Sequence, residues 1–165
     1  LRNSLQVSVD WKKTGFYTAE HGLINTLEAG TGAGAAIIEM LLQSWGERIR
    51  VFPCLPEDWR EASFDTLRAD GAFLVRAVFC EGRTQWVRIT SEAGARCCVE
   101  NPWPGEGAML RDSEKGSQRC LEGPELVFDT VRDGTYELVC AAPAPSGPKS
   151  TSRGQGRFSA LPRWA

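Results

Sequence analysis

Between residues 59 and 141 the sequence consists of short apolar runs that are separated at regular intervals by turn-forming residues. Three of these separators, at 70–71, 81–82 and 133–134, place an acidic residue before glycine, and such pairs favour tight hairpin turns. The runs predicted as strands cover residues 64–68, 72–80, 85–91, 96–100, 125–130 and 135–141. Strands of this length, joined by turns at this spacing, predict an antiparallel β-sandwich.

Composition supports a globular chain with polar extensions. Apolar residues make up 42% and charged residues 24% of the 165 residues, as in ordinary folded domains. Residues 105–123 show only a weak pattern, and residues 142–165 are rich in proline, serine and glycine, which predicts a disordered tail. The net charge of −2 gives no reason to expect a nucleic acid as partner. We expect no membrane partner either, because no apolar run approaches the ~18 to 20 residues that span a bilayer.

The six cysteines include no C-x-x-C pair. Cys80, Cys98 and Cys140 stand among strand-like apolar neighbours, where a free cysteine acts as a small buried hydrophobe. A zinc site needs several well-spaced ligands, and His21 is the only histidine. The sequence therefore predicts neither a metal nor an organic cofactor.

Upstream of the predicted strands lies a helical pattern. The glycines within residues 30–34 predict a tight turn next to Glu28, since glycine accepts backbone conformations that other residues resist. From residue 35 to residue 45 apolar side chains recur at spacings of three and four, which predicts a helix. Gly46 is placed to close this helix in a left-handed conformation. Residues 48–52 then predict a further strand.

Several motifs follow one another in this region: EMLLQS at residues 39–44, an apolar strand at 49–53, Leu-Pro at 55–56, and Trp59. Their order and spacing resemble the junction between the helical barrel and the C-terminal β domain in glycoside hydrolase family 95, whose known members are α-L-fucosidases and related exo-acting enzymes. In that family an acid in a glycine-rich turn, usually Asp-Gly-Asn-Phe-Gly, precedes the helix. This chain reads EAGTG at residues 28–32.

The resemblance extends over about residues 20–100 and implies a fold that is mainly β with an N-terminal helical piece. Residues 1–46 would complete an (α/α)6-type catalytic barrel, residues 47–141 would form the antiparallel β-sandwich, and residues 142–165 would be the tail. The chain begins without methionine and without the apolar core of a signal peptide, so we interpret it as a fragment of a longer protein.

The resemblance also implies a site. Glu28 matches the family's carboxylate that activates water in an inverting hydrolysis of a terminal glycosidic bond, while the partner acid lies upstream in the barrel. His21, seven residues earlier, and Thr31, in the acid turn, are predicted to bind the sugar substrate. The chain alone would be inactive without the upstream barrel, its predicted protein partner. The alternatives are that Glu28 only caps the helix and that His21 has no catalytic role.

A second interpretation is that the sandwich is a non-catalytic carbohydrate-binding or structural module. Aromatic faces can stack on sugar rings, and Trp86 and Trp103 are the candidates on a predicted strand and loop. Both can equally be core residues, because tryptophan contributes a large buried area to a small domain.

Overall fold

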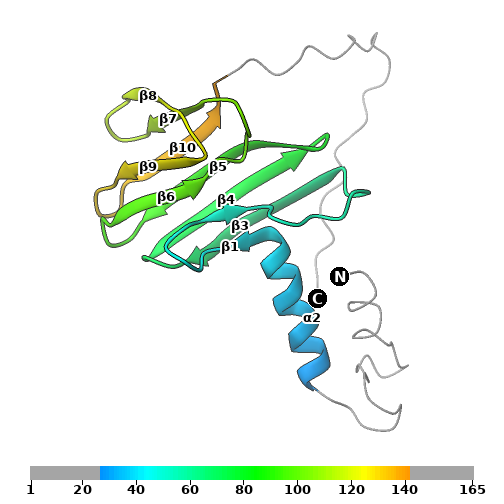
Figure 1. Ribbon diagram of the computed structural model, residues 1–165. Coiled ribbons are helices and arrows are strands. Elements are labelled where there is room, and N and C mark those ends of the chain that lie inside the picture. The colour runs from blue at the N-terminus through cyan, green and yellow to red at the C-terminus, as the bar shows by residue number, and fades with distance from the viewer. Residues whose placement is uncertain (1–26, 142–165) are drawn as a thin grey trace, which may run out of the picture.

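The structure is a computed structural model that describes residues 27–141, which form one helix followed by ten strands (Figure 1). The helix α2 spans Leu27–Leu41. The strands are β1 (Leu42–Gln43), β2 (Arg50–Val51), β3 (Glu61–Ala69), β4 (Phe73–Cys80), β5 (Arg83–Ser91), β6 (Arg96–Glu100), β7 (Ala108–Asp112), β8 (Gln118–Leu121), β9 (Glu125–Asp129) and β10 (Thr135–Cys140). The two terminal segments, with the predicted tail and His21, lie outside the described residues.

The strands form three hydrogen-bonded sets, and every pair within them is antiparallel. The largest is a six-stranded sheet in the order β3-β4-β5-β10-β7-β8, and the others are the pairs β6-β9 and β1-β2. All six strands predicted between residues 64 and 141 are present. The prediction of a mainly β fold with antiparallel sheets is confirmed for the described part of the chain.

The two small sets form one layer. Ile49 makes a parallel bridge to Val99, with hydrogen bonds from Ile49 N to Cys98 O at 2.9 Å and from Glu100 N to Ile49 O at 2.8 Å. The second layer therefore runs β1-β2-β6-β9. Its inward side chains pack against the six-stranded sheet, as the rings of Phe128 and Tyr136 show with centroids 5.5 Å apart.

One continuous hydrophobic core fills the space between the layers. It takes side chains from both, because inward residues alternate with outward ones along each strand. The core consists of Leu42, Ile49, Val51, Ala69, Phe73, Val75, Ala77, Val87, Ile89, Cys97, Val99, Trp103, Ala108, Leu110, Leu126, Phe128, Tyr136 and Leu138. The described residues thus form a two-layer β-sandwich.

Helix α2 differs from the predicted helix at both ends. It begins at Leu27, so residues 30–34 are helical and the predicted glycine turn is wrong. The helix contains four alanines, which have the highest helix propensity, whereas each of its glycines costs about 1 kcal/mol relative to alanine. The helix also ends at Leu41 rather than residue 45, because Leu42 enters the core at 4% exposure and pairs with Val51.

Gly46 therefore does not close the helix. It lies in the turn between β1 and β2, where Gly46 and Glu47 both have positive φ, 72° and 57°. Two consecutive positive φ values are typical of the tight turn that joins antiparallel strands. Figure 1 shows α2 leading away from the strands, with its C-terminal end next to β1. Within the described chain, no helix is both long and apolar enough to cross a bilayer.

Strands β7 and β8 were not predicted. In β8 three of four residues are exposed and the fourth is half-buried, so no alternation marks it as a strand. Its backbone pairs with β7 from Ala108↔Leu121 to Arg111↔Gln118. Only the pairing across the sheet makes this polar segment extended.

Candidate functional site

The predicted acid site lies at the start of the described chain. Glu28 is in the first turn of α2, and the structure describes its backbone only. Thr31 is exposed on the same helix. His21 falls outside the described residues, and Glu28 and Thr31 lie three residues apart on α2. The roles of Glu28, His21 and Thr31 stay predictions.

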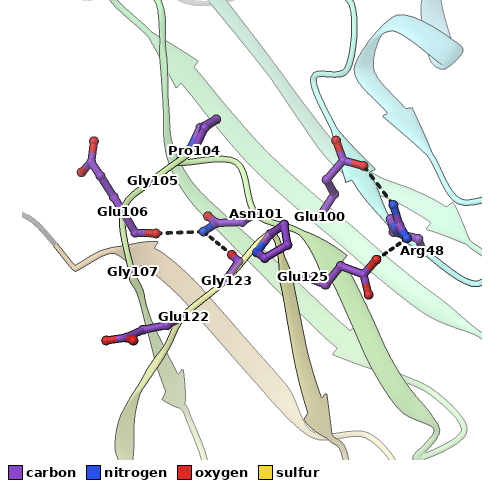
Figure 2. Close-up of a pocket in the computed structure, with 11 residues that line it drawn as sticks. Arg48, Glu100, Asn101, Pro104, Gly105, Glu106, Gly107, Glu122, Gly123 and Glu125 are labelled. Atoms are coloured by element: carbon purple, nitrogen blue, oxygen red, sulfur yellow. Dashed lines mark hydrogen bonds and ion pairs between the residues drawn. The ribbon is translucent and has the colours of Figure 1, made fainter.

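A cavity of about 750 Å³ opens on the sandwich where β6 ends and β9 begins (Figure 2). Its walls come from the loop between β6 and β7, the turn before β9, and Arg48 from the segment before β2. Acidic side chains dominate these walls. The charged and amide side chains among them are Glu100, Glu106, Glu122, Glu125, Arg48 and Asn101.

Asn101 holds the two loops of the cavity together. Its Nδ2 donates to Glu106 O at 2.8 Å and to Gly123 O at 2.9 Å, while its Oδ1 accepts from Trp103 N at 3.0 Å. The residue is 8% exposed, and these bonds satisfy both ends of its amide. Asn101 is therefore a structural clamp rather than a donor aimed at a ligand.

Arg48 joins two carboxylates across the mouth of the cavity. Glu100 and Glu125 stand directly opposite each other in the β6-β9 ladder, where like charges repel. Arg48 forms ion pairs with both, at 3.7 Å to Glu100 and through Nη2 to Glu125 (Figure 2). Arg50 adds a second guanidinium, with Nε 3.2 Å from Glu100 Oε2. The arginines offset the repulsion and hold the β1-β2 hairpin against β6.

Glu106 is ionised at neutral pH. Hydrogen bonds from the Cys140 thiol, at 2.8 Å, and from Arg83, at 2.7 Å, hold the pKa of Glu106 below its ordinary value. A carboxyl with a lowered pKa cannot serve as a general acid near neutral pH. Because Glu100 and Glu125 are also paired with arginine, the geometry of this cavity is that of a braced surface, not of a glycosidase acid and base.

A known protein family matches most of the described residues. The family described as "Glycoside hydrolase family 95, C-terminal domain" matches residues 43–138, from the start of the β1-β2 hairpin to the last strand. The chain belongs to this family. The match confirms the resemblance drawn from the junction motifs.

Two further comparisons add little to the family 95 assignment. A solved structure described as a family 39 glycoside hydrolase from the gut symbiont Bacteroides cellulosilyticus WH2 aligns with 23% identity and a TM-score of 0.35. The alignment covers 48% of this chain and 16% of that chain. Among curated proteins, no significant match was found.

The two tryptophans proposed as sugar contacts have different environments in this family 95 domain. Trp103 is 2% exposed and its Nε1 donates to Thr84 O at 2.8 Å, so it belongs to the core and presents no face to a ligand. Trp86 is half-buried on the outer side of β5, with the Arg88 guanidinium 5.2 Å from its ring centre. Only Trp86 remains a candidate for stacking on a sugar.

Sequence reasoning missed the residues that build the cavity. Asn101 was not singled out, and Arg48 was seen only as part of a strand. Arg48 carries no local signal, because its carboxylate partners lie on β6 and β9. Asn101 bonds locally to Trp103 N and Glu106 O, but its bond to Gly123 O joins residues 22 positions apart. Within residues 27–141 no group of three or more His, Cys, Asp or Glu side chains could hold a metal ion.

Proposed function

We propose that the chain is the C-terminal part of an exo-acting glycoside hydrolase, in which the sandwich braces a helical catalytic domain that precedes it. The hydrolase removes a terminal sugar, of the α-L-fucose type, with inversion at the anomeric carbon. Membership of family 95 supports a hydrolase parent. The cavity described above supports a non-catalytic sandwich, since three of its four carboxylates, Glu100, Glu106 and Glu125, are paired with arginines.

The observation that carries the bracing role is the distribution of exposed apolar side chains. Among the described residues, the large exposed hydrophobics are Ile37 (42%), Ile38 (49%), Trp45 (61%), Trp59 (39%) and Val131 (42%). All but Val131 lie on α2, in the β1-β2 turn or just before β3. Ile37 and Ile38 are neighbours on α2, whereas Trp45 and Trp59 lie near opposite ends of β3. Exposed apolar side chains that gather on one surface mark an interaction site. We refer to Ile37, Ile38, Trp45 and Trp59 as the docking residues.

Trp45 is exposed, and Arg50 holds it in place. The Arg50 guanidinium lies 4.1 Å from its ring centre, and Arg50 Nη1 donates to Trp45 O at 3.0 Å. The same arginine is anchored through Nε to Glu100. An exposed tryptophan fixed by a guanidinium is a low-entropy anchor of the kind found at the centre of interfaces. The docking residues support a partner that covers the N-terminal end of the sandwich.

In the proposed reaction Glu28 acts as the general base. Its carboxylate takes a proton from water as the water attacks the anomeric carbon, and an acid of the upstream domain protonates the departing oxygen. Thr31 and His21 hydrogen-bond to sugar hydroxyls on the same side. The sandwich supplies no group to this chemistry, so the 165-residue chain by itself shows no turnover of aryl glycosides.

Replacement of Glu28 in the full-length parent tests this role. Glu28→Gln removes the base while keeping the shape of the side chain, and we expect kcat to fall by about 10²- to 10⁴-fold. Glu39→Gln is the matched control, because Glu39 is an exposed acid on the same helix. Unchanged turnover in Glu28→Gln, with the control also unchanged, would remove Glu28 from the mechanism.

A further inference from the structure

The outer face of the six-stranded sheet carries an apolar row that crosses four adjacent strands. The strand register places Val78 and Val139 beside Trp86, and Met109 beside Val139. All four side chains are half-buried, while their chain neighbours Ala77, Val87, Leu138 and Leu110 are buried in the core. This row, Val78-Trp86-Val139-Met109, therefore points away from the second layer. We call it the Trp86 row.

A row of charged side chains runs next to the Trp86 row. Arg76, Arg88, Glu137 and Arg111 occupy the corresponding positions two residues along each strand, roughly 7 Å away. Glu137 is central: its Oε2 lies 2.8 Å from Arg88 Nη2 and its Oε1 lies 3.3 Å from Arg111 Nη1. We call Arg88, Glu137 and Arg111 the charge ladder.

The two rows together have the chemistry of a sugar-binding surface. The Trp86 indole and its valine neighbours offer an apolar patch for the C–H face of a pyranose ring. The ladder offers planar donors and acceptors at one edge of that patch. Each guanidinium carries five N–H donors, and Arg88 and Arg111 each donate to Glu137 through one nitrogen.

The ladder offers both donor and acceptor groups. Two guanidinium groups flank one carboxylate, and together they carry a net charge of +1. A neutral polyol can accept from the guanidinium groups and donate to the carboxylate at once.

We propose that the outer face of the six-stranded sheet binds a neutral oligosaccharide, with one sugar ring over Trp86 and its hydroxyls bonded to Arg88, Glu137 and Arg111. This surface lies on the opposite layer from β1 and β2, which carry Trp45 of the docking residues. The proposal does not depend on the catalytic role of Glu28.

Binding of the 165-residue chain to an array of neutral and uronate-containing oligosaccharides tests the proposal, followed by calorimetric titration with the strongest neutral oligosaccharide. We expect saturable binding to neutral glycans, weakened at least tenfold by Trp86→Ala and by Arg111→Gln. Val131→Ala is the control and should bind like the unchanged chain, because Val131 is exposed between β9 and β10 and lies outside the two rows and the docking residues.

Two further variants guard against misfolding. Trp86→Phe keeps an aromatic ring of smaller area and should bind with intermediate affinity, and Glu137→Gln keeps the shape of the acceptor while removing its charge. Far-UV circular dichroism establishes that each variant is folded. The proposal is overturned if no neutral oligosaccharide on the array binds, if folded Trp86→Phe and Arg111→Gln bind as tightly as the unchanged chain, or if uronates bind more tightly than neutral glycans.

Discussion

Cys97 shows how position in the sheet decides the chemistry of a single side chain. Burial, and secondarily the neighbouring Cys98, raise the pKa of the Cys97 thiol to about 12. The sequence interpretation placed buried thiols at Cys80, Cys98 and Cys140, whereas these are half-buried and Cys97 is fully buried. Alternation along β6 points Cys97 and Val99 inward, and adjacent residues in a strand cannot share a face.

The raised pKa of Cys97 gives a pH dependence of stability with a defined sign. An unfolded thiol has a pKa of about 8.5, so above that pH the unfolded chain loses a proton that the folded chain keeps. Stability is fully present below pH 8.5 and falls as pH rises toward 12. Between pH 8 and pH 10 we expect Cys97 to cost about 2 kcal/mol of unfolding free energy.

Urea unfolding under reducing conditions measures this loss. Cys97→Ala should unfold more easily at pH 8 but lose less stability by pH 10, whereas Cys54→Ala, at an exposed position, should follow the unchanged chain. Iodoacetamide should also modify exposed Cys54 and Cys120 long before Cys97. Equal pH slopes in the unchanged chain and Cys97→Ala would show that the thiol titrates normally in the fold.

At the scale of elements, the turns decide how the strands meet. The turn after β5 is tied to the turn after β9, because Ser91 Oγ accepts from Gly94 N at 3.0 Å and from Thr130 Oγ1 at 2.8 Å. Gly94 has a φ of 75°, and a Cβ there would lie 2.9 Å from Arg132 N. Gly94 lies in the gap between the strands predicted at residues 85–91 and 96–100, but its close approach to Arg132 arises only in the folded sandwich.

Two glycine substitutions separate backbone strain from this close approach. Gly82 also has positive φ, 77°, but nothing lies within 4 Å of its missing Cβ. Gly82→Ala should cost about 1 to 2 kcal/mol, the usual penalty for a left-handed residue. Gly94→Ala carries the same strain and a backbone clash, and should cost about 1 to 3 kcal/mol more.

Denaturant midpoints of the two variants provide the comparison. Both changes remove a glycine from the unfolded chain and add one methyl group, so their difference isolates the contact with Arg132. Equal midpoints for Gly82→Ala and Gly94→Ala would mean that the two turns can separate at no cost.

At the scale of the whole molecule, the sandwich has two proposed binding surfaces, one for the preceding domain and one for an oligosaccharide. The docking residues lie on α2, in the β1-β2 turn and before β3, whereas the Trp86 row lies on the outer face of the six-stranded sheet. In the proposed parent the docking residues are covered by the preceding domain. A charge placed among them should then disturb the parent far more than this chain.

Ile38→Glu tests the docking residues. In the 165-residue chain Ile38 is 49% exposed, and its replacement should change stability by no more than about 0.5 kcal/mol. In the full-length parent the same glutamate is buried without a partner and should cost about 2 kcal/mol or more. Val131→Glu is the control in both proteins, because Val131 is 42% exposed and lies between β9 and β10. A parent whose thermal unfolding is unaffected by Ile38→Glu would exclude α2 from the interface.

The sequence by itself determined most of the strands. Alternating runs such as residues 72–80 and 85–91 have the period of a half-buried strand, and the turns at 70–71 and 81–82 have hairpin chemistry. These signals are local, so they survive without knowledge of the fold. The junction motifs at residues 39–44 and 55–56 likewise identified family 95.

The tertiary structure alone decided where α2 ends, how β7 and β8 pair, and which side chains meet. Residues 42 and 43 continue a helical pattern, but pairing with β2 and burial of Leu42 outweigh helix propensity. Asn101, Arg48 and Glu137 find partners on other strands or loops. Such contacts depend on the order of the strands, in which β5 lies beside β10 and β6 lies beside β9. Local sequence patterns do not reveal this order, because the paired strands are far apart in the sequence.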